Sequence, residues 1–96
     1  MDGKDKDDHR NIEALREVLR EINPDMVLFD DMDSAVVGVV RIQGVGTIAC
    51  YDMNLAIQTF MSQGMSREEA QDWVEFNVLD AYVGEFTPAF LIRVGY

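Results

Sequence analysis

The stretch SREEAQDWVEFNVLDAYVGEFTPAF, residues 66–90, decides the fold because it predicts a helix, the end of that helix and the start of a strand. Ser66 and Glu69 have the spacing of a capping box, in which each side chain bonds the backbone N–H of the other residue. Gly84 is a natural terminator for the helix that follows. A Thr-Pro pair then begins an apolar segment, residues 89–94, that we predict to be the last strand.

Upstream of this stretch, the apolar spacing predicts two further helices and three further strands. Apolar residues recur at helical spacing between Asn11 and Ile22, and again after Asp52, which we expect to cap the second helix. Short apolar runs predict three strands, of which the second is rich in the β-branched residues Val and Ile: Met26–Phe29, Ser34–Ile42 and Thr47–Tyr51. The element order α-β-β-β-α-α-β predicts an α+β fold, with three helices and a small antiparallel or mixed four-stranded sheet.

Length and composition indicate a single domain. The 96 residues leave room for one modest core, and 48% hydrophobic with 27% charged residues is typical of a globular chain. Residues 1–10 are almost wholly charged, so we expect a disordered lead followed by one α+β domain over residues 11–96. The lead lacks the apolar core of a signal peptide, and no apolar run in the chain approaches the length of a membrane-spanning helix.

The chain is strongly acidic. Lys and Arg total 8 against 18 Asp and Glu, which gives a net charge of −10. We therefore expect no direct binding to nucleic acid, which needs clustered Lys and Arg, and no adhesion to anionic membranes. A protein partner, in particular a basic one, agrees better with this charge, although an acidic surface also simply favours solubility.

Residue types that support catalysis or metal binding are scarce. Cys50 is the only cysteine and His9 the only histidine, so a zinc enzyme or a Cys-His hydrolase is not expected. A lone cysteine also fits a reducing compartment. The acidic turn at Asp30, Asp31 and Asp33 lacks the glycine and distal glutamate of an EF-hand loop, and we expect an ordinary solvated turn. We predict no metal, no cofactor and no catalytic residue, which favours a protein that is not an enzyme.

The strongest candidates for a contact site lie on and after the helix of the quoted stretch. By helical periodicity Asn77 shares a face with apolar residues, and a buried amide must be hydrogen-bonded. One interpretation is that Asn77 ties the helix to the next loop, and that the neighbouring aromatic residues are core. The other is a pocket around Asn77, Tyr82 and Glu85. The residues that we predict to contact a ligand or a partner are Trp73, Phe76, Asn77, Tyr82, Glu85 and Thr87.

Residues 68–90, EEAQDWVEFNVLDAYVGEFTPAF, resemble the closing segment of a group of small, uncharacterised proteins of phages and bacterial mobile elements. The shared pattern is Glu-Ala, a Trp or Tyr, Glu-Phe-Asn, then Ala-Tyr or Ala-Trp, Val-Gly-Glu and Thr-Pro. The similarity extends over residues 30–92, with Asp80 and Phe86 departing from the pattern. This resemblance implies a phage or prophage source and a kinship in fold, and it assigns no activity to any residue.

Together these observations predict a small acidic phage- or prophage-type protein in the cytoplasm of a bacterial host. We expect it to be a protein–protein interaction module that acts on a host or phage protein, one form being an acidic decoy for a nucleic-acid-binding groove. The alternative is a small ligand-binding domain or enzyme with its site around Asn77. A homodimer is a further hypothesis, because residues 36–42 and 89–94 alternate poorly, as though both faces of the sheet were covered.

Overall fold

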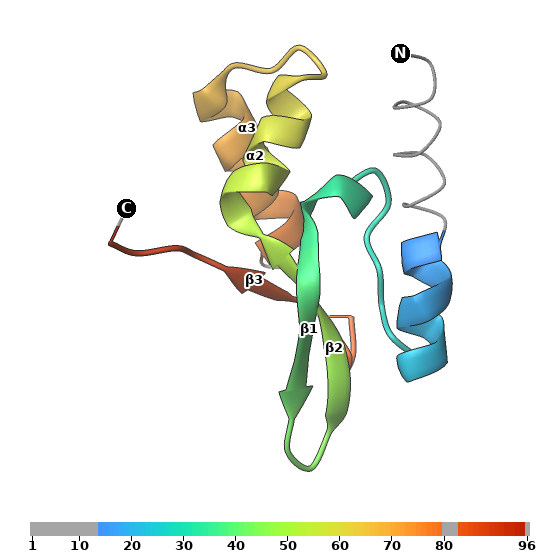
Figure 1. Cartoon of the computed structure of the whole chain (residues 1–96). Coiled ribbons are helices and arrows are strands. Elements are labelled where there is room, and N and C mark those ends of the chain that lie inside the picture. Colours follow the sequence, from blue (N-terminus) through green and yellow to red (C-terminus); the bar gives the residue numbers. More distant parts are fainter. Residues whose placement is uncertain (1–13, 80–82, 96) are drawn as a thin grey trace.

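The computed structural model describes residues 14–79 and 83–95, which form a mixed α+β fold (Figure 1). A helix over residues 14–22 comes first. A 3-10 helix (η1), a π-helix (η2), two α-helices and three strands follow in this order: η1 (Asp33–Ala35), β1 (Val36–Ile42), β2 (Gly46–Asp52), α2 (Met53–Met61), α3 (Arg67–Val74), η2 (Glu75–Leu79) and β3 (Ala89–Leu91). The disordered lead that we expect over residues 1–10 lies outside the described residues.

The described sheet has three strands in the order β1-β2-β3, so our prediction of a four-stranded sheet is wrong. The segment Met26–Phe29, which we expected to be a strand, pairs with none of these strands. The Phe29 N–H donates to the Tyr51 hydroxyl at 2.8 Å, and the Phe29 carbonyl accepts from the Arg16 guanidinium at 3.1 Å. Side chains therefore satisfy backbone groups that a strand would have paired with a neighbouring strand.

Two kinds of connection build this sheet. β1 and β2 pair antiparallel through a tight turn that contains Gly44 with a φ of +83°. Their register shifts between Val36 and Gly38, which is the irregularity expected from a glycine inside a strand. β3 pairs parallel with β2, because the connection through α2 and α3 is long enough to bring the chain back in the same direction.

The helix ends agree with the predicted caps. The Asp52 carboxylate accepts the N–H of Leu55 at 2.9 Å and so caps α2. Ser66 and Glu69 form the reciprocal capping box at the start of α3. Gly64, which lies between the two helices, has a φ of +107°, a conformation that a side chain would make costly.

One hydrophobic core joins the elements. Tyr51 of β2 is at its centre, fully buried, with its ring centroid 5.6 Å from that of Phe29 and 5.6 Å from that of Phe90. Figure 1 shows α2 and α3 at one end of the β1–β2 hairpin and the N-terminal helix alongside it. The buried cluster draws on all of these elements: Leu19, Met26, Met32, Ala35, Ala49, Tyr51, Ala56, Ile57, Phe60, Ala70, Val74 and Val78.

Candidate functional site

The α3–η2 segment presents a surface of exposed side chains that includes two large aromatic residues. The buried residues of this segment, Ala70, Val74 and Val78, recur every four positions. Trp73 is 39% exposed and Phe76 is 76% exposed. We call five exposed residues in the second half of this segment the aromatic surface: Asp72, Trp73, Glu75, Phe76 and Asn77.

Trp73 anchors this surface to the rest of the molecule. Its ring centroid lies 4.7 Å from that of Phe60, a buried residue of α2, with the ring planes inclined at 33°. This is a favourable spacing and tilt for an aromatic pair. One part of the indole is therefore held against the core, and the remainder is open to solvent next to Phe76.

Asn77 is exposed, whereas helical periodicity placed it on the buried face. Its amide nitrogen donates to the backbone carbonyl of Trp73, four residues earlier, at 3.1 Å. The buried positions of this segment are Ala70, Val74 and Val78, so the buried stripe is narrower than predicted and leaves out both Trp73 and Asn77. The amide serves its own helix rather than the loop at Gly84–Thr87.

Two other predicted contact residues, Glu85 and Thr87, lie in the turn that precedes β3. Thr87 closes a turn, because its hydroxyl accepts the N–H of Val83 at 2.9 Å and donates to the carbonyl of Gly84 at 2.5 Å. Glu85 is exposed within that turn. Tyr82 lies outside the described residues. Asn77 bonds to its own helix and Thr87 to its own turn. The pocket around Asn77, Tyr82 and Glu85 stays a prediction.

Acidic side chains predominate on the helical segment that carries the exposed aromatic residues. Along α3 and η2 the exposed charged residues comprise four acids and one base: Glu68, Glu69, Asp72, Glu75 and Arg67. The Glu75 carboxylate accepts a hydrogen bond from Gln71 at 3.2 Å, one turn earlier on the same helix. The aromatic surface is therefore an apolar centre with a negative rim.

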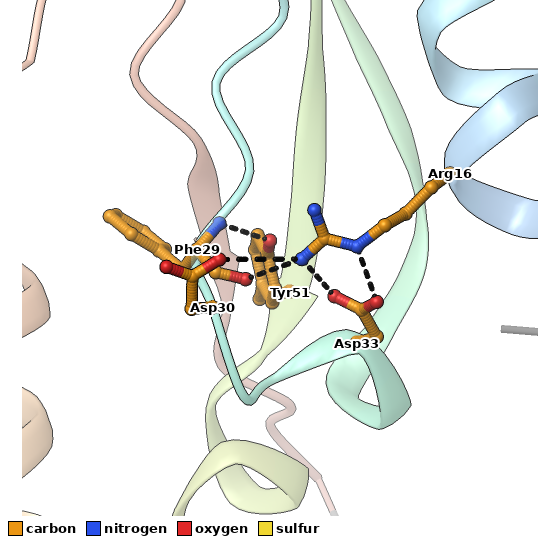
Figure 2. A network of polar contacts seen from close by, with 5 residues as sticks. All are labelled: Arg16, Phe29, Asp30, Asp33 and Tyr51. Carbon is orange, nitrogen blue, oxygen red and sulfur yellow. Dashed lines mark hydrogen bonds and ion pairs between the residues drawn. The ribbon is translucent and has the colours of Figure 1, made fainter. Parts of the chain in front are cut away.

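A second polar cluster connects the N-terminal helix to the sheet (Figure 2). Arg16 holds the Asp33 carboxylate through two nitrogens, at 2.5 and 2.7 Å, and also donates to the Phe29 carbonyl. The hydrogen bond to Asp33 raises the pKa of the Arg16 guanidinium, and burial raises the pKa of the Tyr51 phenol. Both groups therefore keep their protons near neutral pH and act here as structural donors and acceptors.

The described residues include few side chains of the types used in nucleophilic catalysis or metal binding. Cys50 is half-buried, with its sulfur 4.0 Å from the Tyr51 carbonyl, and His9 lies outside the described part of the chain. No group of three or more potential metal ligands occurs among the described residues. No buried side-chain nitrogen or oxygen there lacks a hydrogen-bond partner. The acidic turn uses Asp33 to bind Arg16, which leaves Asp30 and Asp31 exposed.

A hollow in the surface beside α2 and α3 was not predicted from the sequence. Arg67 and Arg93 are far apart in the chain, yet both line an open hollow beside α2 and α3. Their common feature in the sequence is that they are the only bases after residue 42.

Comparisons with known proteins provide no relative. No family model matches the chain, and neither a search of curated proteins nor one of solved structures finds a match. Within residues 14–79 and 83–95, no helix is long and apolar enough to cross a membrane. The resemblance to phage and mobile-element proteins stays a prediction.

Proposed function

We propose that the protein is a small interaction module of phage or prophage type that binds a host or phage protein through the aromatic surface. The observation that carries this proposal is the 76% exposure of Phe76, beside a half-anchored Trp73. A large aromatic side chain left in water forgoes the favourable free energy of burial. A partner that covers Phe76 and Trp73 gains that free energy on binding, and residues of this type dominate the energetics of interfaces.

The rim indicates the chemistry of the partner. Four exposed acidic side chains lie along α3 and η2, and the whole chain carries a net charge of −10. Complementarity of charge and of apolar surface therefore favours a partner protein that has an apolar depression bordered by Lys and Arg. An acidic rim also speeds the approach of a basic partner and makes that rate sensitive to salt.

The α3–η2 segment has two features that favour the binding of a partner protein. The capping box fixes the start of α3, and the Trp73–Phe60 contact fixes its outer face against α2. Side chains on a rigid element lose less conformational entropy on binding than side chains on a mobile loop. The π-turn at Glu75–Leu79 is itself a type of helical irregularity that is frequent at functional sites.

The acidic decoy is the alternative form of this proposal. A decoy would bind through charge alone and would occupy a nucleic-acid-binding groove in the bacterial cytoplasm. Such binding weakens steeply as salt rises, because each ion pair is screened. Binding centred on Phe76 and Trp73 is apolar at its core and is retained at high salt.

The test is affinity capture from bacterial lysate with the tagged full chain, washed in parallel at low and high salt. Wild type and a Phe76→Ala variant are compared with Val18→Ala. Val18 is an exposed apolar residue on the N-terminal helix, far in sequence from the aromatic surface. We expect wild type and Val18→Ala to retain the same partner at both salt concentrations, and Phe76→Ala to lose it.

Two results would contradict the proposal. Capture of the same partner by Phe76→Ala would place the contact elsewhere, and loss of the partner at high salt in wild type would favour the decoy. The same preparations test the homodimer hypothesis, because light scattering over a wide concentration range distinguishes a monomer from a dimer. A dimer that Phe76→Ala abolishes would make a second copy the partner.

A further inference from the structure

An open hollow of about 550 Å³ lies where α2, α3 and the segment after β3 meet. This volume is within the range of sites that bind small molecules. Ile57 of α2 and Ile92 after β3 supply apolar lining. The guanidinium groups of Arg67 and Arg93 line the same space, so the hollow combines apolar surface with two cationic groups.

Arg93 is held in place by a buried acid. Its Nε donates to the Asp52 carboxylate at 2.7 Å, and Asp52 is only 2% exposed. The two terminal nitrogens of Arg93 donate to none of the described residues. Because Nε is fixed on Asp52, the remaining N–H groups of the fork are pre-organised for a second acceptor.

Arg67 is less constrained by its protein contacts. Its one hydrogen bond with a described side chain is to the Asn54 amide oxygen at 3.4 Å, near the long limit for such a bond. It forms no ion pair with any described carboxylate, although seven of the nine charged residues after residue 42 are acids. Two guanidiniums with unused donors therefore line one hollow in an otherwise acidic half of the chain.

The acids near the hollow disfavour a ligand with more than one negative charge. Asp52 forms an ion pair with Arg93, and Glu75 also lines the hollow, so the two guanidiniums do not give a large excess of positive charge. A dianion such as a phosphate monoester would add more negative charge than this balance accommodates. A carboxylate carries one charge and matches the planar fork of an arginine.

We propose that this hollow binds a carboxylate with an apolar body, its carboxylate held by Arg67 and Arg93 and its body packed on Ile57 and Ile92. Two sources share this chemistry: a free small-molecule carboxylate and the C-terminal carboxylate of a peptide with an apolar last residue. The hollow shares Glu75 with the aromatic surface, but the carboxylate binding proposed here does not depend on the interaction proposed for that surface.

The test is a titration of the ¹⁵N-labelled full chain followed by NMR. The probes are 4-methylpentanoate, its neutral amide, and the tetrapeptide Gly-Gly-Ala-Leu with a free or an amidated C-terminus. We expect saturating shifts at residues around the hollow with the two carboxylates, and about tenfold weaker binding or worse with the two amides. The tighter of the two carboxylates identifies the source.

The matched variants are Arg67→Gln and Arg41→Gln, which change the net charge equally. Arg41 is exposed on β1 and does not line the hollow. We expect Arg67→Gln to weaken carboxylate binding about tenfold or more, and Arg41→Gln to leave it within about twofold. The comparison of acid with amide needs no variant, so it holds whatever either substitution does to folding.

Four results would overturn the proposal. They are the absence of saturation by either carboxylate at millimolar concentration, equal binding of acid and amide, equal effects of the two arginine variants, and tighter binding of inorganic phosphate than of either carboxylate.

Discussion

Two groups of aromatic residues in this protein occupy contrasting environments. The rings of Tyr51, Phe29 and Phe90 pack against one another in the core, where Tyr51 is fully buried. On α3 and η2, by contrast, Trp73 is packed on one part only and Phe76 is 76% exposed. Burial of an aromatic side chain contributes strongly to stability. The first group therefore stabilises the fold, whereas the second leaves that free energy for a partner.

The polar atoms of the two regions differ in the same way. Around Tyr51, hydrogen bonds join residues far apart in sequence, as Arg16 with Asp33 and Phe29 with Tyr51 (Figure 2). On the aromatic surface, Asn77 bonds only to its own helix within the described residues. The first region depends on the whole fold, so substitutions there should change stability. Substitutions on the aromatic surface should change binding.

The largest expected effect is that of Tyr51→Ala. Removing a buried aromatic side chain typically costs about 3–5 kcal/mol, and here the cavity would lie between Phe29 and Phe90. We expect the free energy of unfolding, measured by urea denaturation, to fall by that amount. Tyr51→Phe is the control and should cost about 1–2 kcal/mol, because it leaves only the Phe29 N–H unpaired. A loss below about 1 kcal/mol for Tyr51→Ala would contradict a central role for this ring.

Arg16→Ala should have the next largest effect. The guanidinium binds the largely buried Asp33 through two nitrogens and also satisfies the Phe29 carbonyl. Its removal should lower the free energy of unfolding by about 2 kcal/mol, because these acceptors lose their charged donor. Arg20, one turn later on the same helix and exposed, is the matched control. If Arg20→Ala were as costly as Arg16→Ala, the effect would be one of helix propensity or net charge.

A pH titration addresses the junction between α2 and the segment after β3. The N–H of Leu55, followed by Arg93, lowers the pKa of Asp52 in the folded protein. This contribution to stability is complete above the unfolded pKa of Asp and is lost as pH falls through the folded pKa. We expect Asp52→Asn to cost about 1 kcal/mol at neutral pH and to flatten the acid limb of the stability curve. If the free energy of unfolding of Asp52→Asn fell with decreasing pH as steeply as that of wild type, other carboxylates would be responsible for the loss of stability in acid.

Phe76→Ala should have the smallest effect on stability. An exposed side chain that makes few contacts changes the free energy of unfolding by no more than about 0.5 kcal/mol. The same urea denaturation that measures Tyr51→Ala provides the direct contrast. A loss of 2 kcal/mol or more would mean that Phe76 belongs to the core and that the aromatic surface is not free for a partner.

Local features of the sequence predicted much of the fold, whereas features that depend on distant residues were missed. Asp52, the Ser66–Glu69 capping box and the Gly44 turn were predictable because each works within a few residues. Met26–Phe29 has the composition of a strand, but side chains from Arg16 and Tyr51 take up its backbone groups at Phe29. No local pattern encodes that arrangement.

In the candidate site, too, local features were predicted and features that depend on distant residues were missed. Trp73 and Phe76 were predicted as contact residues, and the structure places both at the surface. Asn77 was assigned to the buried face, but the buried stripe of Ala70, Val74 and Val78 is too narrow to include it. The hollow at Arg67 and Arg93 was out of reach, because it requires knowing that the chain after β3 returns beside α2 and α3.

The central claim is that the aromatic surface binds another protein, and site-specific cross-linking in bacterial cells tests it most directly. A photoreactive phenylalanine analogue is placed at position 76 in one variant and at position 18 in another. We predict a discrete cross-linked product with one protein from position 76 and none from position 18. Absence of a product from position 76, or the same products from both positions, would contradict the claim.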